Sequence, residues 1–359
     1  MRYPEFLGQN GCIGFVAPAF GCSTEPYKSG FIAAQDRFKK MGYSIKLGPN
    51  CYESSGIGIS NTPDKCGAEL NSFYTDSGID VLLSCGGGEL MCEVVPYIDF
   101  EAVKNADPKW YMGYSDNTNF TFLSATLADT AALYGPSAAA FGMNPWHKAI
   151  QDAVDVLTGE ACHDGIISLN GYDKWETESL KDDEHPYEPY NTTENTRIIS
   201  LHEGRIEDTV DGIPLSTGDI HMSGRFIGGC MDCLVQLIGT PFDKVEEFTD
   251  RYADDGIIWF MESCDLGPMD VRRAMWHMRQ AGWFKNIKGM VIGRPYRYGE
   301  SFGELNMYRA VVDIISDLAI PIVMDVDIGH HPPMLPVICG SFAEIETDGE
   351  KYTLTMHLR

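Results

Sequence analysis

Short apolar runs alternate with amphipathic stretches through the first third of the chain. In the amphipathic stretches the apolar residues recur every three to four positions, which is the spacing of one face of a helix. This order predicts an open sheet of parallel strands covered by helices, because parallel strands need a long crossover that a helix usually supplies. The predicted strands are 13–17, 44–47, 81–84 and 110–113, and the predicted helices are 31–41, 62–77 and 117–128. Ligands of such sheets bind at the carboxyl ends of the strands.

The alternation stops in an acidic and aromatic stretch, YDKWETESLKDDEHPYEPYNTTEN, which has few aliphatic residues. We expect residues 171–195 to link two domains, 1–170 and 196–359, because a chain of 359 residues exceeds what one hydrophobic core usually serves. The second domain is predicted to contain strands at 196–202, 256–261, 290–293 and 321–326, a helix at 269–281 and a β-rich ending at 343–358. The predicted fold class is therefore α/β.

The chain has 52 acidic and 27 basic residues, which give a formal net charge of -25. Such a charge repels phosphate backbones and anionic membrane surfaces, so neither a nucleic-acid polymer nor a membrane is an expected partner. The first residues, MRYPEFLGQNGCIGFVAPAF, do not follow the pattern of a signal peptide, and no stretch approaches the roughly 20 apolar residues of a spanning helix. We expect a cytoplasmic protein.

The eleven cysteines are scattered through predicted strands and helices, which is typical of reduced core residues. Cys230 and Cys233 are the one tight pair, in the segment GGCMDCL. A zinc site would need a second pair or histidines at ligand spacing, and a thioredoxin-like site would need its own sequence context. We therefore expect no metal and no cofactor.

The segment KWYMGYSDNTNF places Ser115 between a predicted strand and a predicted helix. This is the arrangement of a nucleophile elbow, in which the serine hydroxyl stands clear at the end of the strand and close to a helix N-terminus. The segment departs from the G-x-S-x-G pattern because Asn117 replaces the second glycine, and a serine that merely caps the helix fits the local sequence as well. A cysteine nucleophile at Cys85 or Cys12 is less favoured, because neither lies at this turn.

A glycine run, Gly86, Gly87 and Gly88, follows the predicted strand 81–84. Glycines let backbone N–H groups approach a ligand closely, so Gly87 is a candidate oxyanion donor together with the amide of Asp116, the residue after the serine. Gly86 and Gly88 are then candidate substrate contacts. The alternatives are a turn that binds nothing and a phosphate loop, and the second lacks the lysine and hydroxyl residue that a P-loop carries.

Two more segments place titratable residues after apolar strands. His330 and His331 lie in DVDIGHHPPMLPVICG, where two prolines fix the following backbone. Glu262 ends the run GIIWFME, and a carboxylate that follows a buried strand must be paired or hydrogen-bonded. Orienting a catalytic imidazole is one way to satisfy that requirement.

Read together, these segments resemble the LD-carboxypeptidase family of serine peptidases (peptidase family S66). The resemblance extends over nearly the whole chain and is carried by VAPAFG, the glycine loop, GYSDNT with LYGP, GRFIGGCMDCLVQLIGTPFD, IIWFMES, IKGMVIGRP and the GH segment before LPVICG. It implies a Ser-His-Glu triad of Ser115 as nucleophile, His330 as base and Glu262 as the residue that orients the base. It also implies a Rossmann-like N-terminal domain, a smaller β-rich C-terminal domain, a homodimer and no metal.

The glycine loop continues into Glu89 and departs from the Arg-Gly-Gly-Tyr-Gly form of murein tetrapeptide carboxypeptidases. In this it is closer to the microcin C self-immunity branch, which cleaves the amide or related acyl bond between an amino acid and a nucleotide-like group. The expected substrate is thus an aminoacyl nucleotide or a small peptide, and Trp175, Tyr187 and Tyr190 are candidates to stack on a base. A murein tetrapeptide LD-carboxypeptidase and a non-catalytic binding module are the alternatives.

Overall fold

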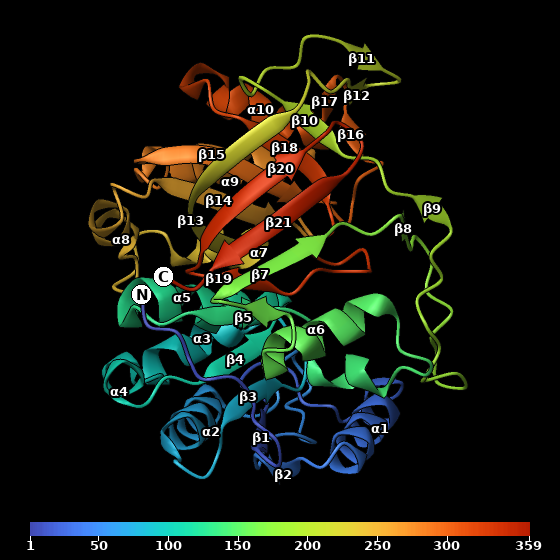
Figure 1. Ribbon diagram of the computed structural model, residues 1–359, viewed down its shortest axis with the longest axis vertical. Helices are drawn as coiled ribbons and strands as arrows, with labels where there is room; N and C mark the ends of the chain where they lie inside the picture. The colour runs from blue at the N-terminus through green and yellow to red at the C-terminus, as the bar shows by residue number, and fades with distance from the viewer. The chain divides into compact units, whose positions relative to one another are not determined.

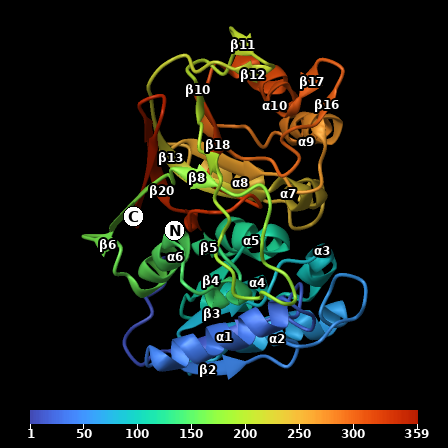
Figure 2. The ribbon, with the colours of Figure 1, turned by 90° about the vertical axis from the view of Figure 1, so that its right-hand side faces the viewer.

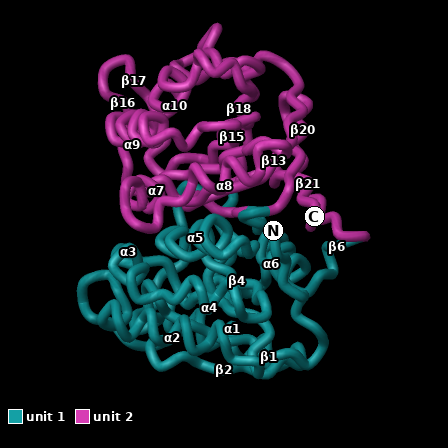
Figure 3. Tube along the Cα trace, turned by 90° about the vertical axis from the view of Figure 1, so that its left-hand side faces the viewer, with its two compact units in different colours: residues 1–163, 176–192, 335–340 teal, residues 164–175, 193–334, 341–359 magenta.

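The computed structural model describes residues 1–359 and divides them into two compact units. Unit 1 comprises residues 1–163, 176–192 and 335–340, and unit 2 comprises residues 164–175, 193–334 and 341–359 (Figure 3). The segment 171–195 is therefore shared, because its middle part belongs to unit 1 and its two ends to unit 2. These ends pair as the short antiparallel strands β8 (Lys174–Trp175) and β9 (Glu194–Asn195), both labelled in Figure 1. The loop that joins them has no regular structure; β8, where it begins, is labelled in Figure 2.

Unit 1 is built on a six-stranded sheet in the order β19-β5-β4-β3-β1-β2 (Figure 1). Five strands are parallel, as the alternating pattern predicts, and β19 is antiparallel to its neighbour β5. The strands are β1 (Cys12–Val16), β2 (Ser44–Leu47), β3 (Val81–Ser84), β4 (Trp110–Gly113), β5 (Ala132–Tyr134) and β19 (Val337–Cys339).

Helices cover both faces of this sheet, because successive strand residues point to opposite sides. Phe15 of β1 packs against Phe31 and Phe38 of α1, with ring centroids 5.1 and 6.3 Å away. The next residue, Val16, belongs instead to a buried cluster with Leu70 and other residues of α2, α4 and α5. The helices are α1 (Tyr27–Lys40), α2 (Pro63–Thr75), α3 (Met91–Val94), α4 (Phe100–Asn105), α5 (Thr118–Ala128) and α6 (Lys148–Thr158).

Unit 2 contains a mixed sheet in the order β10-β18-β15-β14-β13-β20-β21-β7. The two-residue strand β6 (Cys162–His163) ends the first segment of unit 1. The central strands β18, β15, β14 and β13 are parallel, and the strands that flank them pair antiparallel. Their bounds are β7 (Ile166–Asn170), β10 (Ile199–Leu201), β13 (Ile220–Cys230), β14 (Ile257–Glu262), β15 (Ile287–Gly293), β18 (Ile322–Val326), β20 (Phe342–Thr347) and β21 (Tyr352–His357). The helices are α7 (Met231–Leu237), α8 (Val245–Arg251), α9 (Pro268–Gln280) and α10 (Met307–Ile315).

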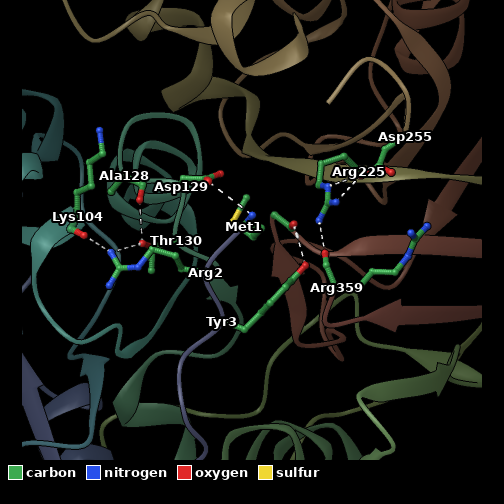
Figure 4. Close-up of polar contacts among 11 residues, drawn as sticks. Met1, Arg2, Tyr3, Lys104, Ala128, Asp129, Thr130, Arg225, Asp255 and Arg359 are labelled. Carbon is green, nitrogen blue, oxygen red and sulfur yellow. Dashed lines mark hydrogen bonds and ion pairs between the residues drawn. The ribbon is translucent and has the colours of Figure 1, made fainter. Parts of the chain in front are cut away.

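Polar contacts anchor the two ends of the chain, each within its own unit (Figure 4). In unit 1 the guanidinium of Arg2 donates to the carbonyl of Lys104, and the hydroxyl of Tyr3 donates to the carbonyl of Gly340 over 3.4 Å. In unit 2 Arg225 pairs with Asp255 and donates to the carbonyl of Arg359 over 3.0 Å. The longest helix, α1, has 14 residues, and no helix combines the length and apolar character needed to cross a bilayer.

Candidate active site

Ser115 lies where the sequence predicts it, in the turn between β4 and α5 of unit 1. Its φ of 61° is in the left-handed region, which a non-glycine residue adopts at some cost in free energy and which is typical of a nucleophile elbow. The backbone N–H of Ser115 donates to the hydroxyl of Tyr134 over 3.0 Å. The strained turn is thus fixed from the neighbouring strand β5.

Asn117 accounts for the departure from the G-x-S-x-G pattern. Its amide nitrogen donates to the carbonyl of Gly86 over 2.8 Å and to the carbonyl of Tyr114 over 2.9 Å, and its amide oxygen accepts from the hydroxyl of Tyr111. The side chain therefore ties the elbow to the glycine loop. It fits because Gly113 has no Cβ, since one added there would lie 2.7 Å from Cγ of Asn117.

The glycine loop approaches Ser115 closely enough for Gly87 to touch the side chain. A Cβ placed on Gly87 would lie 3.1 Å from Cβ and 3.2 Å from Oγ of Ser115. The carbonyl of Gly87 accepts from the N–H of Phe20 over 2.6 Å, whereas the N–H of Gly87 makes no hydrogen bond within the protein. An unused backbone donor beside a serine hydroxyl is the arrangement that an oxyanion hole requires.

Asp116 has a second role that the sequence did not reveal. Its buried carboxylate accepts from the backbone N–H of Met91 over 2.8 Å and from the side chain of Asn119 over 3.1 Å. The first contact fixes the end of the glycine loop, because Met91 begins α3 directly after it. The carboxylate thus supports the loop, while the predicted oxyanion contribution concerns only the backbone amide of this residue.

Glu262 and His330 lie together in unit 2, with Oε2 of Glu262 2.8 Å from Nδ1 of His330. Glu262 is the last residue of β14 and is 1% exposed, and His330 lies in the loop that follows β18. Their approach depends on Gly329, which has a φ of 113° and whose Cβ, if present, would lie 2.7 Å from Oε2 of Glu262. The pairing holds Nδ1 toward the carboxylate and aims Nε2 to the opposite side of the ring, as a general base requires.

His331 is held differently from its neighbour. Its Nε2 lies 3.0 Å from the carbonyl oxygen of Tyr296, and its ring is stacked on the ring of Tyr296 at a centroid distance of 4.9 Å. Trp175 and Tyr298 meet the same imidazole edge-on, at 4.9 and 5.5 Å. His331 is buried in an aromatic cluster, and its contacts are those of a packed histidine.

A buried ion pair anchors the loop that carries His330. Arg294, directly after β15, pairs with Asp327, which is fully buried three residues before His330. The carboxylate of Asp327 also accepts from the hydroxyl of Tyr352 over 3.0 Å and from the N–H of Tyr172 over 2.8 Å. These bonds satisfy both carboxylate oxygens, which a charge without access to water requires.

The remaining candidates have less direct relations to the site. Trp175, in β8, has the guanidinium of Arg294 5.2 Å from its ring centroid. Tyr187 is exposed, and Tyr190 meets the ring of His147 at 5.4 Å, where burial raises the pKa of the Tyr190 hydroxyl. Both tyrosines belong to unit 1 and Trp175 to unit 2.

The cysteines show no sign of a nucleophile or of a metal site. Cys85 is fully buried, and burial raises the pKa of its thiol well above the ordinary value. In the Cys230–Cys233 pair, the contact with the Cys233 thiol and then burial raise the pKa of Cys230. No three histidine, cysteine or carboxylate side chains come together in an arrangement that could hold a metal ion.

Sequence reasoning missed the supporting residues Asn117, Tyr134 and the Arg294–Asp327 pair. The signal that identified Glu262, a charge directly after a buried strand, is also present at Arg294 in VIGRP and at Asp327. Pairing them from sequence requires knowing that β15 and β18 are neighbours in the sheet, which only the structure gives.

Both halves of the chain match models of one family. Residues 13–135 match the LD-carboxypeptidase N-terminal domain, and residues 223–345 match the LD-carboxypeptidase C-terminal domain. A putative carboxypeptidase of Treponema pallidum is 25% identical over 350 residues, which are 96% of this chain and 92% of that protein. The microcin C7 self-immunity protein MccF of Escherichia coli is 22% identical over 354 residues, 97% of this chain and 94% of MccF.

Solved structures of this kind confirm the predicted fold. MccF in complex with aspartyl sulfamoyl adenosine has a TM-score of 0.79 at 19% identity, and the match covers 99% of this chain and 98% of that one. A muramoyltetrapeptide carboxypeptidase from Oxalobacter formigenes has a TM-score of 0.69 at 16% identity, with 96% and 98% covered. With two domain models matched in the expected order, this chain belongs to the LD-carboxypeptidase family.

Proposed function

We propose that the chain is a serine hydrolase that uses Ser115 as nucleophile, His330 as general base and Glu262 to orient the base. The observation that carries the proposal is the 2.8 Å contact between Glu262 and Nδ1 of His330. A nearly unexposed carboxylate that meets one imidazole nitrogen fixes the tautomer in which the other nitrogen accepts a proton. The strained elbow of Ser115, with the unused N–H of Gly87 beside it, supplies the second half of the machinery.

In the proposed reaction Oγ of Ser115 attacks the acyl carbon and Nε2 of His330 takes the hydroxyl proton. The N–H groups of Gly87 and Asp116 stabilise the oxyanion that forms, and His330 then gives its proton to the leaving group. Water releases the acyl group from the serine by the same sequence of steps. Glu262 keeps its charge throughout and stabilises the imidazolium.

For the substrate we propose an amino acid joined to a nucleotide-like group through an amide or related acyl bond. Support comes from the Gly86–Glu89 loop and from the similarity to MccF, whose solved complexes contain glutamyl sulfamoyl guanosine and aspartyl sulfamoyl adenosine. The second candidate is a murein tetrapeptide, which is favoured by the 22% identity with a probable murein peptide carboxypeptidase of Bacillus subtilis. Comparing kcat/KM on the two substrates discriminates between them.

Three variants test the triad, each assayed on aspartyl sulfamoyl adenosine and on the tetrapeptide. Ser115→Ala and His330→Ala should each lower kcat by on the order of 10⁶-fold, and the double variant should be no worse, because triad members act as a unit. Glu262→Gln should be less severe. Wild-type protein should also bind a fluorophosphonate covalently at Ser115. Full activity of either alanine variant would refute the assignment. So would full activity of wild-type enzyme that the fluorophosphonate fails to label.

A further inference from the structure

An open groove lies in unit 2 beside the Glu262–His330 pair. Its volume is about 560 Å³, and it is lined by Cys264, Asp265 and the five residues from Tyr296 to Glu300. One wall therefore begins two residues after Glu262, and the other is the loop that follows β15. The triad does not use this groove.

Two tyrosine rings dominate the wall. Tyr296 is 52% exposed and Tyr298 is 47% exposed, so each residue presents about half of its surface to solvent. The ring centroid of Tyr296 lies 6.4 Å from that of His330, so the exposed surface begins directly next to the proposed base. The ring of Tyr296 is therefore a neighbour of the proposed base on the side of the groove.

The tyrosine rings are held firmly, although they are exposed. The N–H of Tyr296 donates to the carbonyl of Ser263 over 3.0 Å, and the carbonyl of Tyr296 meets Nε2 of His331 at 3.0 Å. Tyr298 packs edge-on against Trp175 at 5.3 Å. A surface whose geometry is fixed before binding loses little conformational entropy when a ligand covers it.

The polar groups of the groove are mainly acceptors. Arg297 is the one cation, and it is already engaged, because Nη1 donates to the carbonyl of Asp265 over 2.8 Å and Nε donates to Glu300 over 2.6 Å. The carboxylate of Asp265 is exposed and makes no hydrogen bond within the protein. Flat rings beside a carboxylate that lies near Arg297 but accepts no hydrogen bond match a planar ligand that carries N–H donors.

We propose that this groove binds an amino-substituted heteroaromatic ring, stacked on Tyr296 and met edge-on by Tyr298, with its exocyclic amine donating to Asp265. The inference rests on the proposed function, since it assigns the part of the substrate that carries the base to one side of His330. In this proposal Trp175 does not stack on the ligand but holds the ring of Tyr298 in place. The ring of Trp175 is already met by Tyr298, by His331 and by the guanidinium of Arg294, which leaves it less surface for a ligand than either tyrosine.

The test compares aspartyl sulfamoyl adenosine with its inosine analogue, which lacks the amine, and with a ribose analogue that lacks the base. Tyr296→Leu should raise KM for the adenosine compound by about tenfold through lost stacking, with kcat nearly unchanged and little effect on the ribose analogue. Tyr296→Phe should have the wild-type KM, because phenylalanine keeps the ring on which the ligand stacks. Asp265→Asn should reduce the preference for adenosine over inosine from about fivefold toward none. The matched control is Phe302→Leu, because Phe302 is 71% exposed in unit 2 but lies outside the groove.

Binding to the Ser115→Ala variant, measured by calorimetry with the same three compounds, separates the two proposals. Tyrosine-dependent binding of the adenosine compound without hydrolysis by wild type would retain the groove and overturn the reaction. Hydrolysis with equal KM for all three compounds in wild type and Tyr296→Leu would overturn the groove and retain the reaction. An effect of Phe302→Leu as large as that of Tyr296→Leu would also overturn the groove.

Discussion

Replacing Asp327 by asparagine removes one charge from the buried Arg294–Asp327 pair and leaves the shape of the site almost unchanged. Asparagine can still accept from Tyr352 and from the N–H of Tyr172, so the perturbation is chiefly an uncompensated guanidinium. Both side chains of the pair are almost completely buried. Breaking such a pair destabilises a protein by about 3 to 5 kcal/mol, which corresponds to roughly 10² to 10⁴ in the folding equilibrium.

Chemical denaturation of wild type and variants, followed by tryptophan fluorescence, measures this loss. The matched control is Asp317→Asn, because Asp317 is 62% exposed and meets Arg279 with two short hydrogen bonds, and an ion pair exposed to water contributes little to stability. Adding Arg294→Met to Asp327→Asn should recover at least half of the loss, because the double variant has no unpaired charge. If Asp327→Asn is as mild as Asp317→Asn, or if Arg294→Met makes it worse, an uncompensated buried guanidinium is not the cause of the instability.

Activity should survive EDTA and should rise with pH as the His330 imidazole loses its proton and can act as a base; inactivation by EDTA with recovery on added zinc would contradict the serine mechanism. Burial raises the pKa of Asp325 to about 6 from 3.8, so the folded state binds the proton more tightly and stability falls as pH rises between these values. Asp325→Asn should therefore gain up to about 3 kcal/mol relative to wild type between pH 4 and pH 7, and a pH-independent difference in unfolding free energy would refute this origin. Gly329→Ala should lower kcat strongly by displacing Glu262, whereas Gly349→Ala, with a similarly positive φ of 88° and open space around it, should change only stability, by about 1 to 2 kcal/mol. Equal activity of the two glycine variants would show that the close approach to Glu262 is not required.

The local features of the site were accessible from the sequence because they depend on neighbouring residues. A strand, a serine and a helix in succession predict an elbow, and the structure places Ser115 in one, with a positive φ. The helix expected at 269–281 is α9 (Pro268–Gln280), and the β-rich ending is β20 and β21. In these segments the spacing of the apolar residues and the residues typical of the ends of an element predict the same helix or strand.

Long-range pairings could not be predicted in the same way. The strand β19 has only three residues and lies more than 200 positions after its partner β5, so no local sequence pattern predicts that they pair. Within the stretch 171–195, predicted to link two domains, residues 176–192 cluster with unit 1 and both ends cluster with unit 2. Side-chain partners such as Tyr134 for Ser115 likewise follow from which strands are adjacent. Local propensity does not contain that information.

The late position of β19 also bears on how the chain is synthesised. Most of unit 1 is synthesised before unit 2, but its sheet lacks the strand beside β5 until residues 335–340 have been made. Throughout that time β5 is an unpaired strand edge, of the kind that pairs with foreign strands. Nascent chains and fragments that stop before residue 335 should therefore depend on chaperones far more than chains that include β19 do.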